Sequence, residues 1–294
     1  MMITTSQKEQ FHRDGYLVLR GFVPPGDVET LLARSKALLQ DFKLEDHPLT
    51  RFTTGDEGGN GHIGDAYFLE SGDKIRYFLE EDAVADGQLT RPKNMAVNKI
   101  GHALHELDPA FRKVTLENDR MRDLVRSLQF HRDPVALQSM VITKQPQIVG
   151  EHNDSINQYT DPPSALGFWI ALEKCTASNG ALSFLPGSHL TTPITKRFVR
   201  LPGGGTGFEP LVSQELAAQV AARSKAASDS YVLETCEPGD LVLIHGSVLH
   251  KSERNTSDKT RFAYTFHMIE SGATYDGKNW LQPTPTMPFS RILV

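Results

Sequence analysis

The sequence predicts a mixed, β-dominated fold: a core of the jelly-roll or cupin-like type with flanking N-terminal helices. Short apolar runs bounded by Gly, Pro, Asn and Asp recur from about Val135 onwards, which is typical of many short strands. The N-terminal part instead has apolar residues at the helical period. No linker separates the halves, so we expect one domain over residues 1–294, with 1–133 as mainly helical support, 134–270 as the β core and 271–294 as a C-terminal tail.

The N-terminal elements follow in chain order. Residues 6–14 predict a short helix, and the apolar run 16–19 predicts a strand. A longer helix is expected after Pro24-Pro25-Gly26, with Asp27 as its N-cap. A second helical region is predicted over about 98–128, interrupted at Asp108-Pro109.

The strands of the core are predicted where short apolar runs alternate with turn residues. These runs cover residues 137–143, 165–172, 180–187, 240–250 and 261–269. Two glycine-rich patches, 54–64 and 202–207, are predicted to be mobile loops. The second patch lacks the Gly-Lys-Ser/Thr ending of a phosphate-binding loop, so a nucleotide site there is not expected.

Composition excludes several classes of protein. Hydrophobic residues make up 39% and charged residues 23%, an ordinary globular balance. The net charge of −5 leaves no basic surplus for nucleic acid or an anionic membrane surface. We find no apolar run of membrane-spanning length and no signal-peptide pattern, so we expect a cytoplasmic protein. Cys175 and Cys236 are too few for a disulfide framework and are expected to be reduced, structural thiols.

The sequence His152-Asn153-Asp154 follows a predicted strand and is the first candidate for metal binding. In an extended chain residues i and i+2 face the same side, so this imidazole and this carboxylate converge. His250, after the predicted strand around 241–244, is the candidate third ligand. Two histidines and one carboxylate form the facial triad of non-haem Fe(II) oxygenases, which leaves positions for a co-substrate and O₂.

Arg261 begins the strand that follows His250 and could hold a carboxylate in a bidentate fork. The distal carboxylate of 2-oxoglutarate needs such a group, although a surface arginine in an ion pair is the ordinary alternative. A jelly-roll hydrolase that uses zinc is disfavoured, because it would give Arg261 no task.

Four other histidines are rival candidates for ligands. His245 and His267 are expected to be packed or hydrogen-bonded strand residues. His102 and His105, three residues apart on the predicted helix, are expected on its surface or in a packing contact.

Eight longer segments resemble the phytanoyl-CoA dioxygenase family, and within it the phytanoyl-CoA dioxygenase domain-containing proteins. They are GDKIRYFLE (72–80), NKIGHALHELDPAFR (98–112), LQSMVITKQP (137–146), GFWIALE (167–173), NGALSFLPGSH (179–189), GDLVLIHGSVLHKS (239–252), RFAYTFH (261–267) and NWLQP (279–283). The resemblance implies a double-stranded β-helix core, dependence on Fe(II), 2-oxoglutarate and O₂, and the metal ligands His152, Asp154 and His250.

The resemblance also implies contacts with the co-substrate. Arg261 matches the arginine that pairs with the distal carboxylate, and Ser252 matches a serine that contacts the same molecule. Lys99 matches a lysine that reaches it from the helical region, and Met140 and Trp169 match residues that line its pocket. Without the resemblance, Lys99 reads as a solvated helix residue, and Met140 and Trp169 as ordinary core.

The expected activity is oxidation, most simply hydroxylation, of a small and largely hydrophobic organic substrate, with release of succinate and CO₂. Ascorbate is the expected reductant in vitro. The intact carboxylate disfavours halogenation, because related halogenases lack that ligand. The segment before His152 is short and the loop 155–159 is polar, so the relatives' substrates do not transfer. A 2-oxoglutarate-binding sensor that oxidises no substrate is the alternative, and the sequence predicts no oligomeric state.

Overall fold

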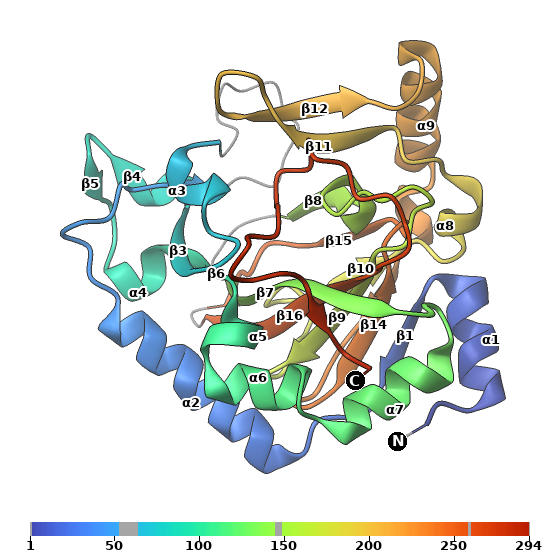
Figure 1. Ribbon diagram of the computed structural model, residues 1–294, viewed down its shortest axis with the longest axis horizontal. Coiled ribbons are helices and arrows are strands. Elements are labelled where there is room, and N and C mark those ends of the chain that lie inside the picture. The colour runs from blue at the N-terminus through green and yellow to red at the C-terminus, as the bar shows by residue number, and fades with distance from the viewer. Residues whose placement is uncertain (1, 53–63, 145–148, 258–259, 294) are drawn as a thin grey trace.

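Two sheets that pack against each other form the centre of the computed structural model (Figure 1). The structure describes residues 2–52, 64–144, 149–257 and 260–293. The predicted jelly-roll core is therefore confirmed, with helices on the outside of the larger sheet. Within the described ranges, no helix has the length and apolar character needed to cross a membrane.

The major sheet has nine strands among the described residues. Their order is β1 (Tyr16–Leu19), β14 (Leu241–His245), β9 (Leu166–Ala171), β16 (Arg261–Glu270), β7 (Pro134–Lys144), β6 (Val97–His102), β3 (Ile75–Glu80) and β2 (Arg51–Phe52), with β17 (Ser290–Arg291) paired to β7. The N-terminal region and the C-terminal tail thus both contribute strands to this sheet.

The minor sheet has the order β13 (Val232–Glu234), β10 (Leu182–Phe184), β15 (His250–Ser252) and β8 (Val149–His152). Two separate hairpins pair β11 (Lys196–Arg200) with β12 (Thr206–Pro210), and β4 (Val84–Ala85) with β5 (Gln88–Leu89). These four minor-sheet strands cover one face of the major sheet and complete the space in which the candidate site lies.

Side-chain alternation along β16 explains why the major sheet has two different faces. Phe262, Tyr264 and Phe266 point to the outer face and join the large apolar cluster formed with the helices. Ala263 points to the inner face and packs in the cluster shared with the minor sheet. Because paired residues in antiparallel strands share a face, the register of β16 with β7 and β9 decides which side chains reach the inner space.

Helices cover the outer face, as Figure 1 shows for α2, α6 and α7. The helices are α1 (Thr5–Asp14), α2 (Pro25–Asp41), α3 (Ala66–Leu69), α4 (Lys93–Ala96), α5 (Leu104–Leu107), α6 (Pro109–Thr115), α7 (Asp119–Leu128), α8 (Ser188–Thr191) and α9 (Gln214–Ala226), with 3₁₀ turns η1 (Glu81–Ala83), η2 (Asp154–Ile156) and η3 (Ser228–Ser230). The predicted stripe of α2 is confirmed, because Val28, Leu31 and Leu38 are buried.

The prediction of a helical region over about 98–128 was wrong at its beginning. Residues 97–102 form β6, whose six residues are all buried, and helix begins only at Leu104. Lys99 and His102 therefore lie on a strand. Asp27 was predicted as an N-cap, but Pro24 occupies that position and Asp27 lies in the first turn of α2.

The two glycine patches have different outcomes. Residues 53–63 lie outside the described residues, so the loop predicted over 54–64 is untested there. Gly203, Gly204 and Gly205 all have positive φ and form the turn between β11 and β12, so a loop at this place is confirmed. Cys175 and Cys236 are buried, free thiols whose backbones bond to each other.

Candidate metal centre

His152 and Asp154 lie where β8 ends and η2 begins. Asn153 between them is extended, with φ −127° and ψ 146°, so the two flanking side chains point to the same side. The His152 Nε2 atom lies 3.9 Å from Asp154 Oδ1. The sequence-based prediction that this imidazole and this carboxylate converge is therefore confirmed.

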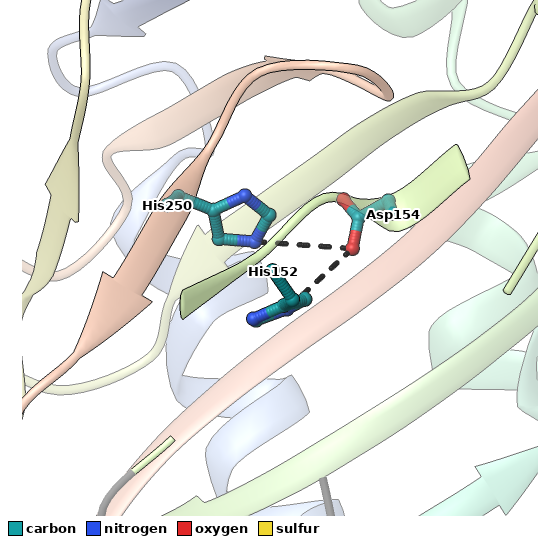
Figure 2. A group of neighbouring side chains, drawn as sticks. All are labelled: His152, Asp154 and His250. Atoms are coloured by element: carbon teal, nitrogen blue, oxygen red, sulfur yellow. Dashed lines mark ion pairs between the residues drawn. The ribbon is translucent and has the colours of Figure 1, made fainter. Parts of the chain in front are cut away.

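His250 is brought to this pair by the neighbouring strand. It opens β15 and is the direct register partner of His152 on β8, so the two imidazoles share one face. Its Nε2 atom lies 3.8 Å from Asp154 Oδ1. One ligand atom from each residue lies within 4.8 Å of the other two, as Figure 2 illustrates. Two imidazole nitrogens and a carboxylate oxygen in this arrangement fit a metal ion of the Fe(II) type.

The electrostatics keep the Asp154 carboxyl in its charged, ligating form. Burial alone would raise its pKa, but the imidazoles of His267 and His250 outweigh that effect and hold the pKa well below the ordinary carboxyl value. Asp154 is buried, and His152 is only partly exposed. A buried carboxylate surrounded by imidazoles is the charge arrangement that a divalent cation would complete.

His267 orients Asp154 from the inner face of β16. Its Nε2 atom lies 3.3 Å from Asp154 Oδ2, the carboxylate oxygen turned away from His152 and His250. The Gln138 Nε2 group donates to His267 Nδ1 at 3.5 Å, which leaves the Nε2 proton for the carboxylate. His267 is thus a hydrogen-bonded strand residue, as expected, and sequence reasoning missed only that its partner is a candidate ligand.

Gly167 leaves the room that this contact requires. It is the register partner of His267 on β9. A Cβ at this position would lie 3.1 Å from Asp154 Oδ2 and 3.4 Å from His267 Nε2. The remaining rival histidines lie elsewhere. His245 packs against Phe11 and His189, His102 hydrogen-bonds Ser71, and His105 hydrogen-bonds Ser139.

Arg261 is a buried guanidinium with donor groups to spare. Its side chain lies on the inner face, and its Nη2 group donates to the Gly180 carbonyl at 2.7 Å. Its Cζ atom lies 5.1 Å from the centre of the Trp169 ring, which restricts the guanidinium plane. The Nε and Nη1 groups have no hydrogen-bond partner among the described residues. Buried donors without acceptors fit an anionic ligand.

Ser252 shares the acceptor of Arg261. Its hydroxyl donates to the Gly180 carbonyl at 2.7 Å, so one carbonyl oxygen accepts from both predicted co-substrate contacts. Gly180 itself has a φ of +81°. This conformation favours glycine. The structure therefore brings Ser252 and Arg261 to one place, although their contact with a co-substrate stays a prediction.

Lys99, Met140 and Trp169 also reach the inner face. Met140 and Trp169 are the register partners of Thr265 on either side of β16, and Lys99 pairs with Ile142 on β7. Lys99 is buried, contrary to the solvated helix residue that the pattern alone suggested. Burial lowers its pKa to about 7, although Asp154 and Glu80 act in the opposite direction. The charge of Asp154 therefore influences the pKa of the Lys99 amine.

The chain is similar to known proteins over nearly its whole length. The profile of the phytanoyl-CoA dioxygenase family matches residues 11–263. A Bos taurus protein named phytanoyl-CoA dioxygenase domain-containing protein 1 is 42% identical over 300 residues, which cover 98% of this chain and 97% of that protein.

Solved structures show the same fold. The non-heme alpha ketoglutarate dependent carbocyclase SnoK from nogalamycin biosynthesis has a TM-score of 0.64 and 16% identity, covering 98% of this chain and 96% of that chain. EctD from S. alaskensis, solved with 2-oxoglutarate and 5-hydroxyectoine, has a TM-score of 0.61 and 19% identity, covering 99% of this chain and 87% of that chain. At these identities the likeness establishes the fold alone.

Proposed function

Because the chain belongs to the phytanoyl-CoA dioxygenase family of Fe(II)- and 2-oxoglutarate-dependent dioxygenases, we propose that it hydroxylates a small, largely hydrophobic organic substrate, with release of succinate and CO₂. One observation carries the proposal. The His152, Asp154 and His250 side chains converge within the same two-sheet core that buries Arg261 with free donor groups. Binding of 2-oxoglutarate requires both features, because a metal holds its 2-oxo acid group and a buried cation holds its far carboxylate.

The three candidate ligands would hold Fe(II) through two imidazole nitrogens and one carboxylate oxygen. A metal ion held by these three groups from one side would keep its remaining positions for exchangeable ligands. When bound, the iron supplies the coupling of O₂-dependent decarboxylation of 2-oxoglutarate to oxidation of a substrate C–H bond. The Asp154 carboxylate contributes negative charge, and His267 fixes its orientation.

Residues of the inner face would position the co-substrate. The Nε and Nη1 groups of Arg261 have no acceptor among the described residues and are available to donate charge-assisted hydrogen bonds to a carboxylate. Gly180 and Trp169 hold the guanidinium in place. Lys99 and Met140 line the same face of the sheet, and their buried side chains help to exclude bulk water from the reacting groups.

The apolar nature of the substrate is supported by the surroundings of η2. Ile156, two residues after Asp154, packs against an aromatic cluster that includes Phe198 and Trp280. The Trp280 Nε1 group donates to the Asn157 carbonyl at 3.0 Å, which fastens the loop after the ligands to this cluster. Aromatic residues thus pack against the loop that follows Asp154, and such surroundings suit a substrate with an apolar body.

The test is succinate formation by the purified protein with Fe(II), 2-oxoglutarate and ascorbate, in air and under anaerobic conditions. We expect succinate in air that requires added iron and disappears without O₂. If iron and 2-oxoglutarate bind but no succinate forms, a panel of apolar organic acids and esters is added to stimulate turnover. Absence of binding of both iron and 2-oxoglutarate would contradict the proposal.

Product analysis separates a hydroxylase from a sensor that only decarboxylates its co-substrate. A hydroxylase yields oxidised product in a one-to-one ratio with succinate when its substrate is present. A sensor yields succinate whose amount is independent of every compound added. The proposed hydroxylation requires the first result for at least one member of the panel.

A further inference from the structure

Lys144, the last residue of β7, is a buried lysine that neither the sequence patterns nor the family resemblance assigns to a task. Its exposed fraction is 3%. The Nζ amine is completely enclosed and has no hydrogen-bond partner among the described residues. Burying an ammonium group without a partner is costly, so such a lysine normally faces a ligand or an ion pair.

The register of the major sheet places Lys144 directly beside Arg261. The two residues are paired across β7 and β16, and directly paired residues point to the same face of an antiparallel sheet. Lys144 therefore reaches the inner face at the same level as the guanidinium. Arg261 has two further enclosed groups, Nε and Nη1, without acceptors among the described residues. Three unsatisfied donor groups thus belong to two neighbouring cations.

Gly180 contacts the side chains of both Arg261 and Lys144. Its carbonyl accepts from Arg261 Nη2 at 2.7 Å. A Cβ at Gly180 would lie 2.7 Å from Lys144 Cε and 3.2 Å from Lys144 Cγ, so the lysine stem runs directly over this glycine. Gly180 therefore holds the guanidinium through its carbonyl, and the stem of Lys144 packs against its Cα.

The acidic side chains around this spot do not hydrogen-bond the Lys144 amine. Burial and the neighbouring Arg261 lower the pKa of Lys144 to about 7, against the opposite influence of Glu80 and Glu253. Two buried cations side by side repel each other, and a bound anion would remove both the repulsion and the unsatisfied donors. The arrangement is thus that of a prepared anion site.

We propose that Lys144 and Arg261 together form the seat for the distal carboxylate of 2-oxoglutarate, an inference that rests on the proposed function. A carboxylate has two oxygens that can accept several hydrogen bonds. Arg261 supplies donors at fixed positions on its planar guanidinium, and Lys144 supplies another donor from the adjacent strand. The seat therefore selects 2-oxo acids that carry a second carboxylate and disfavours those with a neutral tail.

The experiment measures ligand binding by anaerobic calorimetry, using protein loaded with Mn(II) as a redox-inactive metal. The probes are 2-oxoglutarate and 2-oxopentanoate, which share the metal-binding 2-oxo acid but differ in the distal carboxylate. Lys144→Met is expected to weaken 2-oxoglutarate binding by at least about tenfold, as for loss of a hydrogen bond to a charged group. Its affinity for 2-oxopentanoate is expected to stay unchanged.

Lys144→Gln, which keeps a donor group but removes the charge and is one atom shorter, is measured in parallel in case the methionine variant does not fold. Lys113→Met, at an exposed lysine of α6, is the matched control, and Arg261→Met is the positive control. Unchanged binding of 2-oxoglutarate by a folded Lys144 variant would overturn the inference, as would an equal loss for both probes. Failure of the wild-type protein to bind 2-oxoglutarate would instead contradict the proposed function.

Discussion

At the scale of single residues, the candidate metal centre depends on how firmly Asp154 is held. The carboxylate faces His152 and His250 with one oxygen and His267 with the other. Asp154→Ala is expected to abolish Mn(II) or Fe(II) binding, because it removes the only anionic member of the candidate group. Calorimetric metal titration checks this result. Wild-type metal affinity in the variant would contradict coordination by Asp154.

Gly167 gives a second test at this scale, because its lack of a side chain leaves space for the contact between Asp154 and His267. Gly167→Ala is expected to weaken metal binding by about 10–100-fold, the usual effect of disturbing groups that orient a metal ligand. Gly277→Ala is the matched control, because a Cβ there meets nothing within 4 Å. Equal metal affinity of the two variants would contradict an orienting role for His267.

Arg261 provides the corresponding test for the co-substrate. Arg261→Ala is expected to raise the dissociation constant for 2-oxoglutarate at least about thirtyfold, which corresponds to about 2 kcal/mol for charge-assisted hydrogen bonds. Metal affinity is expected to stay at the wild-type value, since Arg261 is not one of the candidate ligands. An unchanged dissociation constant would show that another cation holds the carboxylate.

The sequence predicted the three candidate ligands but not their support. His152 and Asp154 are separated by one residue, a pattern visible in the chain itself. The partnership of His267 with Asp154, and of Lys144 with Arg261, depends on the register between distant strands. A position such as Lys144 looks like any strand-ending lysine until the neighbouring strand is placed beside it.

At the scale of elements, the outer face of β16 contributes to stability and its inner face contributes to the metal centre. Phe266 is fully buried on the outer face and stacks on Phe168 at 4.6 Å, whereas the next residue, His267, faces the metal centre. Phe266→Ala is expected to lower the free energy of unfolding by about 3–5 kcal/mol. Urea-induced unfolding measures this loss.

The same variant, as long as it is folded, is expected to bind Mn(II) with wild-type affinity. His267→Ala is its counterpart on the opposite face and is expected to lose metal affinity. A loss of metal affinity in Phe266→Ala without a loss of stability would contradict the division of the strand into two faces.

Strong periodicity made some elements predictable and weak periodicity hid others. The apolar stripe of α2 and the apolar run of β16 were recognised from the sequence and are confirmed. β6 was missed because its polar residues Asn98, Lys99 and His102 are buried, so its sequence shows neither an apolar run nor a regular alternation of apolar and polar positions. Its neighbours in sequence are helical, and this made the whole segment resemble a helix.

At the scale of the whole molecule, buried histidines make stability depend on pH. Burial lowers the pKa of His105 to about 4, with Glu106 opposing and Arg112 adding to the effect. Burial also lowers the pKa of His245 to about 4, helped by neighbouring histidines. Both imidazoles stay neutral in the folded protein where the unfolded chain, with its ordinary value of 6.5, already binds protons.

Stability is therefore expected to fall as the pH drops from about 6.5 towards about 4, at up to about 1.4 kcal/mol per pH unit for each such histidine. Urea unfolding at pH 7 and pH 5 measures the change. His105→Asn is expected to reduce this pH dependence relative to the wild type. A stability that is constant over this range would contradict the neutral, buried state of these side chains.

The overall architecture was predictable because many short strands in the sequence indicate a jelly roll. The contribution of the N-terminal region to the major sheet was not predictable. Its strands β1, β3 and β6 extend the major sheet, and β17 near the C-terminus pairs with β7. These pairings join segments far apart in sequence, and no local pattern specifies which edge a short strand will meet.

The most direct test of the central claim is whether binding of 2-oxoglutarate depends on a metal at His152, Asp154 and His250. Calorimetry under anaerobic conditions would compare the wild-type protein with and without Fe(II), and Asp154→Ala with Fe(II). We expect the wild-type protein to bind one 2-oxoglutarate per chain, and to bind it tightly only with iron. In Asp154→Ala, iron is expected not to increase the affinity for 2-oxoglutarate. Equal affinity for 2-oxoglutarate in all three samples would show that the triad and the Arg261 seat do not share one ligand, which would contradict the account.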